Sequence, residues 1–140
     1  MTINEIQDEI IEEFSLFDNR NDQYAYIIEL GKKLAQLPES LKTEENIVKG
    51  CQSKVWLQPG FEEGKVQFQA DSDSTLVKGL VGLLVRVLSD RIPEEINNAE
   101  LYFVDKIGLR EMLSMNRSNG LSAMIKQMRL YAIAYQAKYN

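Results

Sequence analysis

The sequence of 140 residues contains no histidine and only one cysteine, Cys51. Cysteine proteases and transferases of the Cys/His type need an imidazole to take the thiol proton, so the sequence excludes that class. One thiol also excludes an internal disulfide, a Cys/His zinc site and an iron–sulfur cluster held by this chain alone. Chemistry at Cys51 would therefore depend on the thiolate itself, and we expect Lys49 and Lys54 to favour that form.

Positive charge is also scarce. The net charge is −5, which argues against a nucleic-acid partner, because such a surface needs a basic patch. The first 18 residues hold six acidic and no basic side chains, so we expect no signal peptide. The most apolar run, residues 76–88, is too short to span a bilayer and contains Lys78 and Arg86. With one unpaired thiol, these features predict a soluble cytoplasmic protein without a membrane partner.

Charge is unevenly distributed between the two ends of the chain. Residues 1–18 carry only acidic charge, whereas residues 115–140 carry four basic and no acidic side chains. Two solvated helix faces would explain this distribution. A docking patch for a larger partner at one end would explain it as well, and both interpretations stay open.

Two amphipathic helices are predicted before Pro38. Thr2 and Glu5 form a capping-box pattern at the start of the first helix. Its apolar residues recur at helical spacing and are Ile3, Ile6, Ile10, Phe14 and Phe17. The second helix is indicated by Tyr24, Ile27, Ile28, Leu34 and Ala35. Residues 19–22 supply its cap, and Pro38 ends it.

The hydrophobic period changes to two after residue 46. Val55 and Leu57 share one face of a short strand, and residues 65–71 alternate between apolar and polar side chains. We expect a β-hairpin whose connection contains Pro59-Gly60 and residues 62–64. Ile47 and Val48 would add a third strand at the edge. The polar alternate positions predict a sheet that is covered on one face only.

The second half of the chain is predicted to be helical. Residues 76–88 are apolar nearly all round, which places a helix at the centre of the core, capped by Asp73 or Ser74. Gly79 and Gly82 would let another element approach it closely. A short helix begins at Pro93, one or two more surround Gly108, and a long last helix covers residues 121–135.

The predicted fold class is therefore α+β. A small antiparallel sheet of about three strands packs against several helices, in the order helix, helix, strands, helices. No linker, repeat or low-complexity tract interrupts the chain, and 44% of the residues are hydrophobic. We therefore expect a single domain over residues 1–140.

Three separated motifs accompany this pattern. Cys51 lies in G-C-Q-S-x-V-W, preceded by E-N-x-V. The second motif is Asp71-Ser72-Asp73, and the third is Arg117-Ser118-Asn119-Gly120. In this order and spacing the chain resembles the SufE-type sulfur-acceptor proteins, and the resemblance spans most of its length. Relatives often carry a histidine where this chain has Met112, which argues against an obligatory imidazole at that position.

The resemblance implies a function in sulfur transfer. Cys51 would accept persulfide sulfur from a cysteine desulfurase that depends on pyridoxal phosphate (PLP), and the protein would stimulate that partner. The sulfur would then pass to an iron–sulfur scaffold. The protein would need no cofactor of its own, and would act as a carrier and activator more than as an enzyme. A weak homodimer stays open.

The remaining motif residues have interpretations of their own. Arg117 shares the family motif, and we expect it to stabilise an anion beside the thiol or to dock the partner. The acidic residues at 71 and 73 favour the N-terminus of the core helix over a metal site, because a third ligand is missing. Trp56 is predicted to anchor the sheet. Two other functions stay open: a one-cysteine thiol redox enzyme or sensor, and a non-catalytic adaptor whose cysteine is structural.

Overall fold

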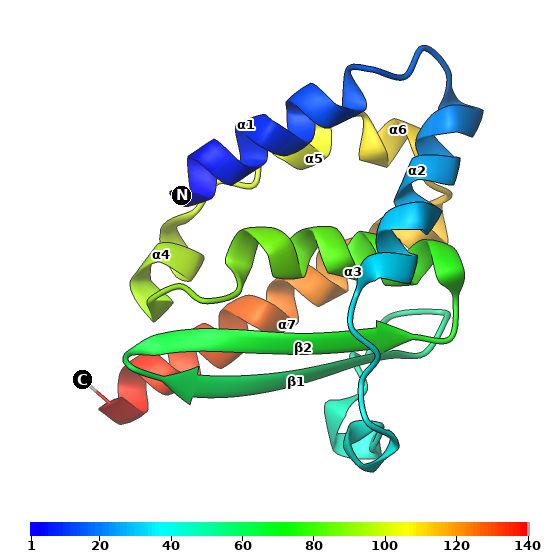
Figure 1. Ribbon diagram of the computed structural model, residues 1–140. Helices are drawn as coiled ribbons and strands as arrows, with labels where there is room; N and C mark the ends of the chain where they lie inside the picture. The colour runs from blue at the N-terminus through cyan, green and yellow to red at the C-terminus, as the bar shows by residue number, and fades with distance from the viewer. Residues whose placement is uncertain (140) are drawn as a thin grey trace.

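The computed structural model describes residues 1–139 and has the α+β architecture expected from the sequence (Figure 1). The helices and strands follow in the order α1 (Ile3–Phe14), α2 (Arg20–Lys33), the 3-10 turns η1 (Glu39–Leu41) and η2 (Glu44–Asn46), β1 (Val55–Glu62), β2 (Lys65–Ser72), α3 (Thr75–Leu88), α4 (Pro93–Asn98), α5 (Phe103–Lys106), α6 (Leu109–Met112) and α7 (Met115–Tyr139). The predicted order of helix, helix, strands and helices is confirmed.

Local chemistry sets the ends of several helices as predicted. The Thr2 hydroxyl accepts from the Glu5 amide and the Glu5 carboxylate accepts from the Thr2 amide, which completes the capping box of α1. Ser74, the second of the two predicted candidates, caps α3. Pro93 is the first residue of α4, and Gly108, at φ +74°, separates α5 from α6.

The sheet of the described residues has two strands, not three. β1 and β2 pair antiparallel along their whole length, and Glu63 and Gly64 form the turn with positive φ values of 53° and 79°. Ile47 makes only one isolated bridge, to Trp56. The chain departs from the sheet directly afterwards, because it turns at Gly50 with φ +96°.

The predicted connection of the hairpin was too long. Pro59 and Gly60 lie inside β1, where they are paired with Phe68 and Gln67. Proline lacks an N–H to donate, but each strand of a two-stranded sheet has a free edge where that loss is tolerated. The turn therefore needs only the two residues that adopt positive φ.

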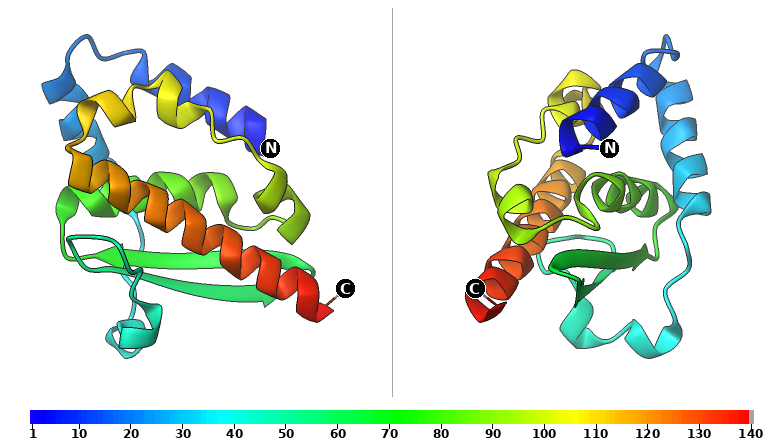
Figure 2. Two further views of the ribbon diagram at one scale, coloured as in Figure 1. Left: turned by 180° about the vertical axis from the view of Figure 1, so that it is seen from behind. Right: turned by 60° about the vertical axis from the view of Figure 1, so that its left-hand side comes forward.

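Helix α3 is the centre of the core. The right-hand view of Figure 2 looks nearly along it and shows α1, α2, α7 and the hairpin arranged around it. Nine of its 14 residues are buried, as expected for a helix that is apolar nearly all round. A Cβ atom built on Gly79 would lie 2.6 Å from Ile27 Cγ2, so the predicted close approach of another element is confirmed there. Gly82 has ordinary room, since its Cβ would be 3.8 Å from Leu34 Cδ2.

The last helix begins earlier than predicted. α7 starts at Met115, so Arg117, Asn119 and Gly120 lie in its first turns and do not form a capping loop. The Ser114 hydroxyl accepts from the amide of Arg117 at 3.3 Å, which satisfies one of the free amides of the first turn. Across residues 1–139, no helix has the length and apolar character needed to cross a membrane.

Candidate functional site

Cys51 lies on the loop of residues 49–54, which precedes β1 and faces the start of α7. The two ends of the loop are firmly held. Val48 N donates to Val55 O at 2.8 Å. At the other end, Lys54 N donates to Asp73 Oδ1 at 3.0 Å, while Lys54 O accepts from Ser72 Oγ at 2.8 Å. The segment that joins β2 to α3 therefore braces the Cys51 loop.

Asp71 has a different role from the one predicted for it. It belongs to β2 and is 3% exposed, and its carboxylate accepts from Leu37 N at 3.1 Å and from Ser72 N at 2.8 Å. Burial alone would raise the pKa of Asp71. The two backbone hydrogen bonds and the Lys78 ammonium at 3.4 Å outweigh it, so the pKa lies below its usual range. Asp71 thus anchors the segment after α2 to the sheet.

The acidic residues of the motif at 71–73 accept hydrogen bonds from main-chain amides. Asp71 accepts from Leu37 N and Ser72 N, and Asp73 accepts from Lys54 N. No three side chains of cysteine, aspartate or glutamate in residues 1–139 come together in a way that could hold a metal ion.

The Cys51 thiol is partly sheltered in this structure. Its side chain is half-buried, and its Sγ lies 3.5 Å from Gly120 O, to which the thiol donates. Burial raises the pKa of Cys51. The prediction that Lys49 and Lys54 would favour the thiolate is therefore wrong for this conformation, because both lysines are exposed and burial sets the direction of the shift.

Two cavities meet at Cys51. The inner one is small, about 60 Å³, and its wall is formed by Val77, Leu80 and Met124. Gln52, Ser53, Asn116, Arg117 and Gly120 complete it. On the outer side is a shallow depression of about 340 Å³, lined by Gly50, Cys51, Gln52, Asn116 and Asn119. The thiol therefore lies between a small inner cavity with one apolar wall and a more open polar depression.

The structure brings Arg117 to the same cavity as Cys51, from the first turn of α7. Its side chain is exposed, so its charge lies at the mouth of the cavity. Gln52, Asn116 and Met124 also line the site and were not singled out from the sequence. Met124 lies one helical turn after Gly120. A predicted helix that began at Met115 would have placed both residues on the same face.

Two other residues of the sequence analysis lie outside this cavity. Trp56 is in β1, as expected for an anchor of the sheet, and the Lys42 ammonium lies 5.4 Å from its ring centroid. Met112, at the position where the resemblance suggested a histidine, is buried in the core.

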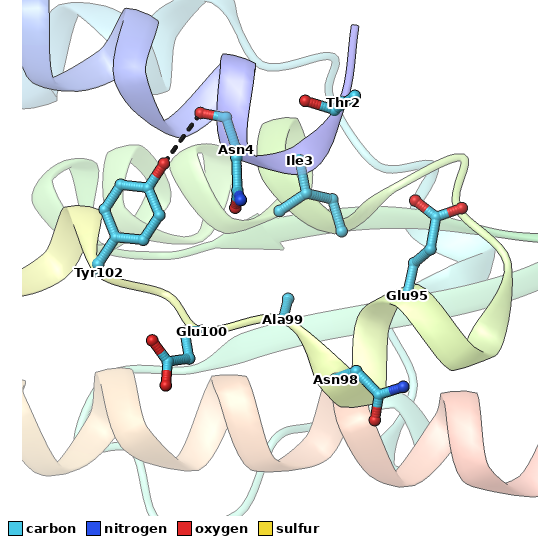
Figure 3. Close-up of a pocket in the computed structure, with 8 residues that line it drawn as sticks. All are labelled: Thr2, Ile3, Asn4, Glu95, Asn98, Ala99, Glu100 and Tyr102. Carbon is cyan, nitrogen blue, oxygen red and sulfur yellow. Dashed lines mark hydrogen bonds between the residues drawn. The ribbon is translucent and has the colours of Figure 1, made fainter.

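A larger cavity, of about 420 Å³, lies elsewhere. It lies between the first turn of α1, α4 and the segment that leads to α5 (Figure 3). The Thr2 hydroxyl at its edge caps α1, and the Tyr102 hydroxyl lies 3.1 Å from Asn4 O. No thiol lines this cavity, and its hydroxyls are already engaged in hydrogen bonds. Cys51 is the only thiol among the described residues, and two cavities adjoin it.

The fold and the site together define an α+β protein with one half-buried thiol on a braced loop. The family model of SufE, described as an Fe-S metabolism associated domain, matches residues 8–132. The chain belongs to this family. Membership gives it a role in iron–sulfur metabolism.

Individual relatives and one solved structure agree with this assignment. SufE-like proteins of Rhizobium meliloti (strain 1021) and Rhizobium etli are 40% and 42% identical over 127 residues, covering 87% of this chain and 91% and 86% of theirs. One from Synechocystis is 39% identical and covers 91% of this chain and 80% of its own. The solution structure of a hypothetical protein from Thermus thermophilus superposes with a TM-score of 0.76 at 22% identity, covering 94% of this chain and 96% of its own, and supports the fold.

Proposed function

We propose that this protein accepts sulfur from a PLP-dependent cysteine desulfurase onto Cys51 and delivers it to an iron–sulfur scaffold. The observation that carries the proposal is the position of the thiol, half-buried beside a small cavity of about 60 Å³ that has Val77, Leu80 and Met124 on one wall. A cavity of roughly 10–15 Å³ already holds a water molecule, so this one has room for an added sulfur atom.

The transfer step is a thiol exchange. The Cys51 thiolate attacks the outer sulfur of a persulfide on the donor cysteine, and a new S–S bond forms as the donor's S–S bond breaks. The donor cysteine leaves as a thiolate and takes up a proton. Cys51 then carries the persulfide, and the total number of electrons on the two proteins is unchanged, so no oxidant or cofactor is needed.

The resting conformation shelters the Cys51 thiol and disfavours its reactive thiolate form. Its pKa is raised by burial, and its Sγ contacts a main-chain carbonyl. Besides that contact, one hydrogen bond joins the loop to α7, from Asn116 Nδ2 to Gln52 Oε1 at 3.4 Å. A partner that binds the open loop better would shift the population toward it and expose the thiol. After transfer, closure would shelter the persulfide against Val77, Leu80 and Met124.

Arg117 is proposed to act at the mouth of the cavity. Its guanidinium would favour the anionic thiolate or persulfide once the loop opens, since an opposite charge nearby stabilises the charged form. The single domain predicted over residues 1–140 would carry the whole of this function. A reducing cytoplasm would keep its lone thiol free for it.

Intact-mass spectrometry tests the proposal. After incubation with a cysteine desulfurase and free cysteine, the protein should gain the mass of one sulfur atom, which a reductant removes. The variant Cys51→Ser should fold with nearly unchanged stability and gain nothing, because a hydroxyl is not ionised at neutral pH. Sulfur gain by Cys51→Ser would refute the proposal. Oxygen adducts under peroxide, without sulfur gain, would favour a redox enzyme, and no change in either reaction would favour an adaptor.

Arg117→Ala is a second arm of the same experiment. We expect slower sulfur gain at low desulfurase concentration, with thermal unfolding unchanged because the side chain is exposed. An unchanged rate would limit Arg117 to a structural role in the first turn of α7.

A further inference from the structure

Helix α7 has a second surface that the sulfur-acceptor site does not use. A groove of about 370 Å³ runs along its outer side, lined by Ile125, Lys126, Arg129, Leu130 and Ile133, with Arg110 from α6 at its edge. Leu130 and Ile133 are 47% and 52% exposed, which is high for large aliphatic side chains. The groove therefore joins an apolar floor to cationic side chains.

The charge of this surface is the reverse of that of the molecule. The protein has a net charge of −5, yet α7 holds four of its 16 basic and none of its 21 acidic residues. Arg110 is paired with Asp105 at 3.2 Å, and Arg129 donates to Ala99 O at 2.7 Å. Lys126 makes no ion pair with any residue in the described part of the chain. Its charge is available to a partner.

The groove and the Cys51 site lie on different sides of α7. Gly120 contacts Cys51, and Arg129 follows nine residues later, which is about two and a half helical turns. Its side chain therefore projects from the side of the helix roughly opposite to Gly120. Figure 2 (left) shows how α7 crosses the back of the molecule, with only its first turns near the Cys51 loop. A partner in the groove would not cover the thiol.

We propose that this groove docks an acidic, amphipathic helical segment of a protein partner, and that it does so without covering Cys51. Apolar side chains at helical spacing would cover Leu130 and Ile133, and flanking carboxylates would pair with Lys126 and Arg129. The net negative charge of the chain disfavours nucleic acid and anionic membranes, which present extended negative surfaces. A short acidic segment meets only the local positive charge.

A designed peptide tests this chemistry directly. The probe is a synthetic helical peptide with leucines at i, i+4 and i+7 flanked by glutamates, titrated into the isotopically labelled full chain. We expect amide shifts concentrated in residues 122–133, and binding that weakens as salt is raised. A peptide with lysines in place of the glutamates should bind at least about 10-fold more weakly, because its charge repels Lys126.

Matched variants locate the binding. Lys126→Glu should weaken binding of the acidic peptide about 10-fold or more. Lys65→Glu changes the net charge equally at an exposed position of β2 beside the hairpin turn, and it should leave binding unchanged. Ile133→Ser removes an exposed apolar contact without reversing a charge, and it should weaken binding as well. The rate of Cys51 alkylation should be the same with and without the peptide.

Several results would overturn the proposal. Equal binding of the acidic and basic peptides would show that charge does not select the partner. No binding, or amide shifts outside α7, would show that the groove is not the docking site. Slower Cys51 alkylation in the presence of the peptide would refute the separation of the two surfaces. Binding to vesicles of phosphatidylglycerol and phosphatidylcholine, with none to the acidic peptide, would assign the groove to membranes.

Discussion

The space beside two glycines differs between the scaffold of this protein and its candidate site. A Cβ on Gly79 in α3 would lie 2.6 Å from Ile27 Cγ2 and 2.8 Å from the Ile27 carbonyl carbon. A Cβ on Gly120 in α7 would lie 3.6 Å from Cys51 Sγ, an ordinary contact. The first approach is to the backbone and the side chain of Ile27 in the close-packed core, where neither can shift without cost. The second is against a side chain on a loop beside a cavity. Tight packing thus fixes the scaffold at Gly79, whereas the site has room for an added methyl group at Gly120.

The largest effect is expected for Gly79→Ala. The added methyl group must push α2 away from α3, and we expect a loss of about 3 kcal/mol in the free energy of unfolding, measured by denaturant titration. Gly82→Ala is the matched control three residues later, where the Cβ would be 3.8 Å from Leu34 Cδ2. It should be neutral or stabilising by up to about 1 kcal/mol, because alanine favours helix. Equal effects of the two changes would contradict the close packing at Gly79.

Asp71→Ala should have the next largest effect. It removes the acceptor of the buried Leu37 amide, and we expect a loss of about 2 kcal/mol. The pKa of Asp71 is lowered in the folded protein, so its carboxylate contributes stability above the pKa of the unfolded chain. That contribution is lost as pH falls through the lower folded pKa. The difference in stability between wild type and Asp71→Ala, measured from pH 7 downward, should therefore shrink in acid. A difference that stays constant would exclude the carboxylate as its source.

Asp73→Ala should act on the site and leave the scaffold nearly intact. It removes the hydrogen bond from Lys54 N, worth about 1 kcal/mol, and so favours opening of the Cys51 loop. The open thiol loses the burial that raises its pKa, so alkylation by a bulky reagent at pH 7 should become about 5-fold faster. Ser72→Ala removes the neighbouring contact to Lys54 O and should act in the same direction. An unchanged alkylation rate in both variants would mean that this segment does not restrain the loop.

The smallest effect is expected for Gly120→Ala. The new methyl group fits beside Cys51 Sγ and favours helix, so stability should change by less than about 1 kcal/mol. Alkylation of Cys51 should become slower, because the methyl group adds to the shelter of the thiol. A loss comparable to that of Gly79→Ala would show that the two glycines are packed equally tightly and would contradict the comparison.

Much of the fold could be predicted because it depends on neighbours in the sequence. The cap at Thr2, the start of α4 at Pro93 and the break at Gly108 all result from local backbone chemistry. The predictions failed where residues typical of turns or caps lie inside a regular strand or helix. Pro59 and Gly60 are typical turn residues, yet pairing with β2 keeps them in a strand. Asn119 and Gly120 are typical capping residues, yet α7 continues through them.

The site was predicted in part. Its motif led to Cys51 and Arg117, and the structure places both at one cavity. The lining by Met124 and the contact of Cys51 with Gly120 were not found. Cys51 and Gly120 are 69 positions apart, and periodicity within one helix cannot say which distant loop its face will meet.

The sequence by itself determined the elements, their order and the single thiol without a histidine, since these depend on side-chain chemistry and on spacing of a few residues. Only the tertiary structure decided the state of that thiol. From the neighbouring sequence alone, Lys49 and Lys54 would lower the pKa of Cys51. In the folded protein, α3 and α7 bury Cys51 and raise its pKa. It likewise decided that Asp71 accepts from the Leu37 amide and that Ser74, not Asp71, caps α3. Burial depends on groups from distant parts of the chain. For the pKa of Cys51, the loss of solvation of the thiolate outweighs the effect of neighbouring charges that remain in water.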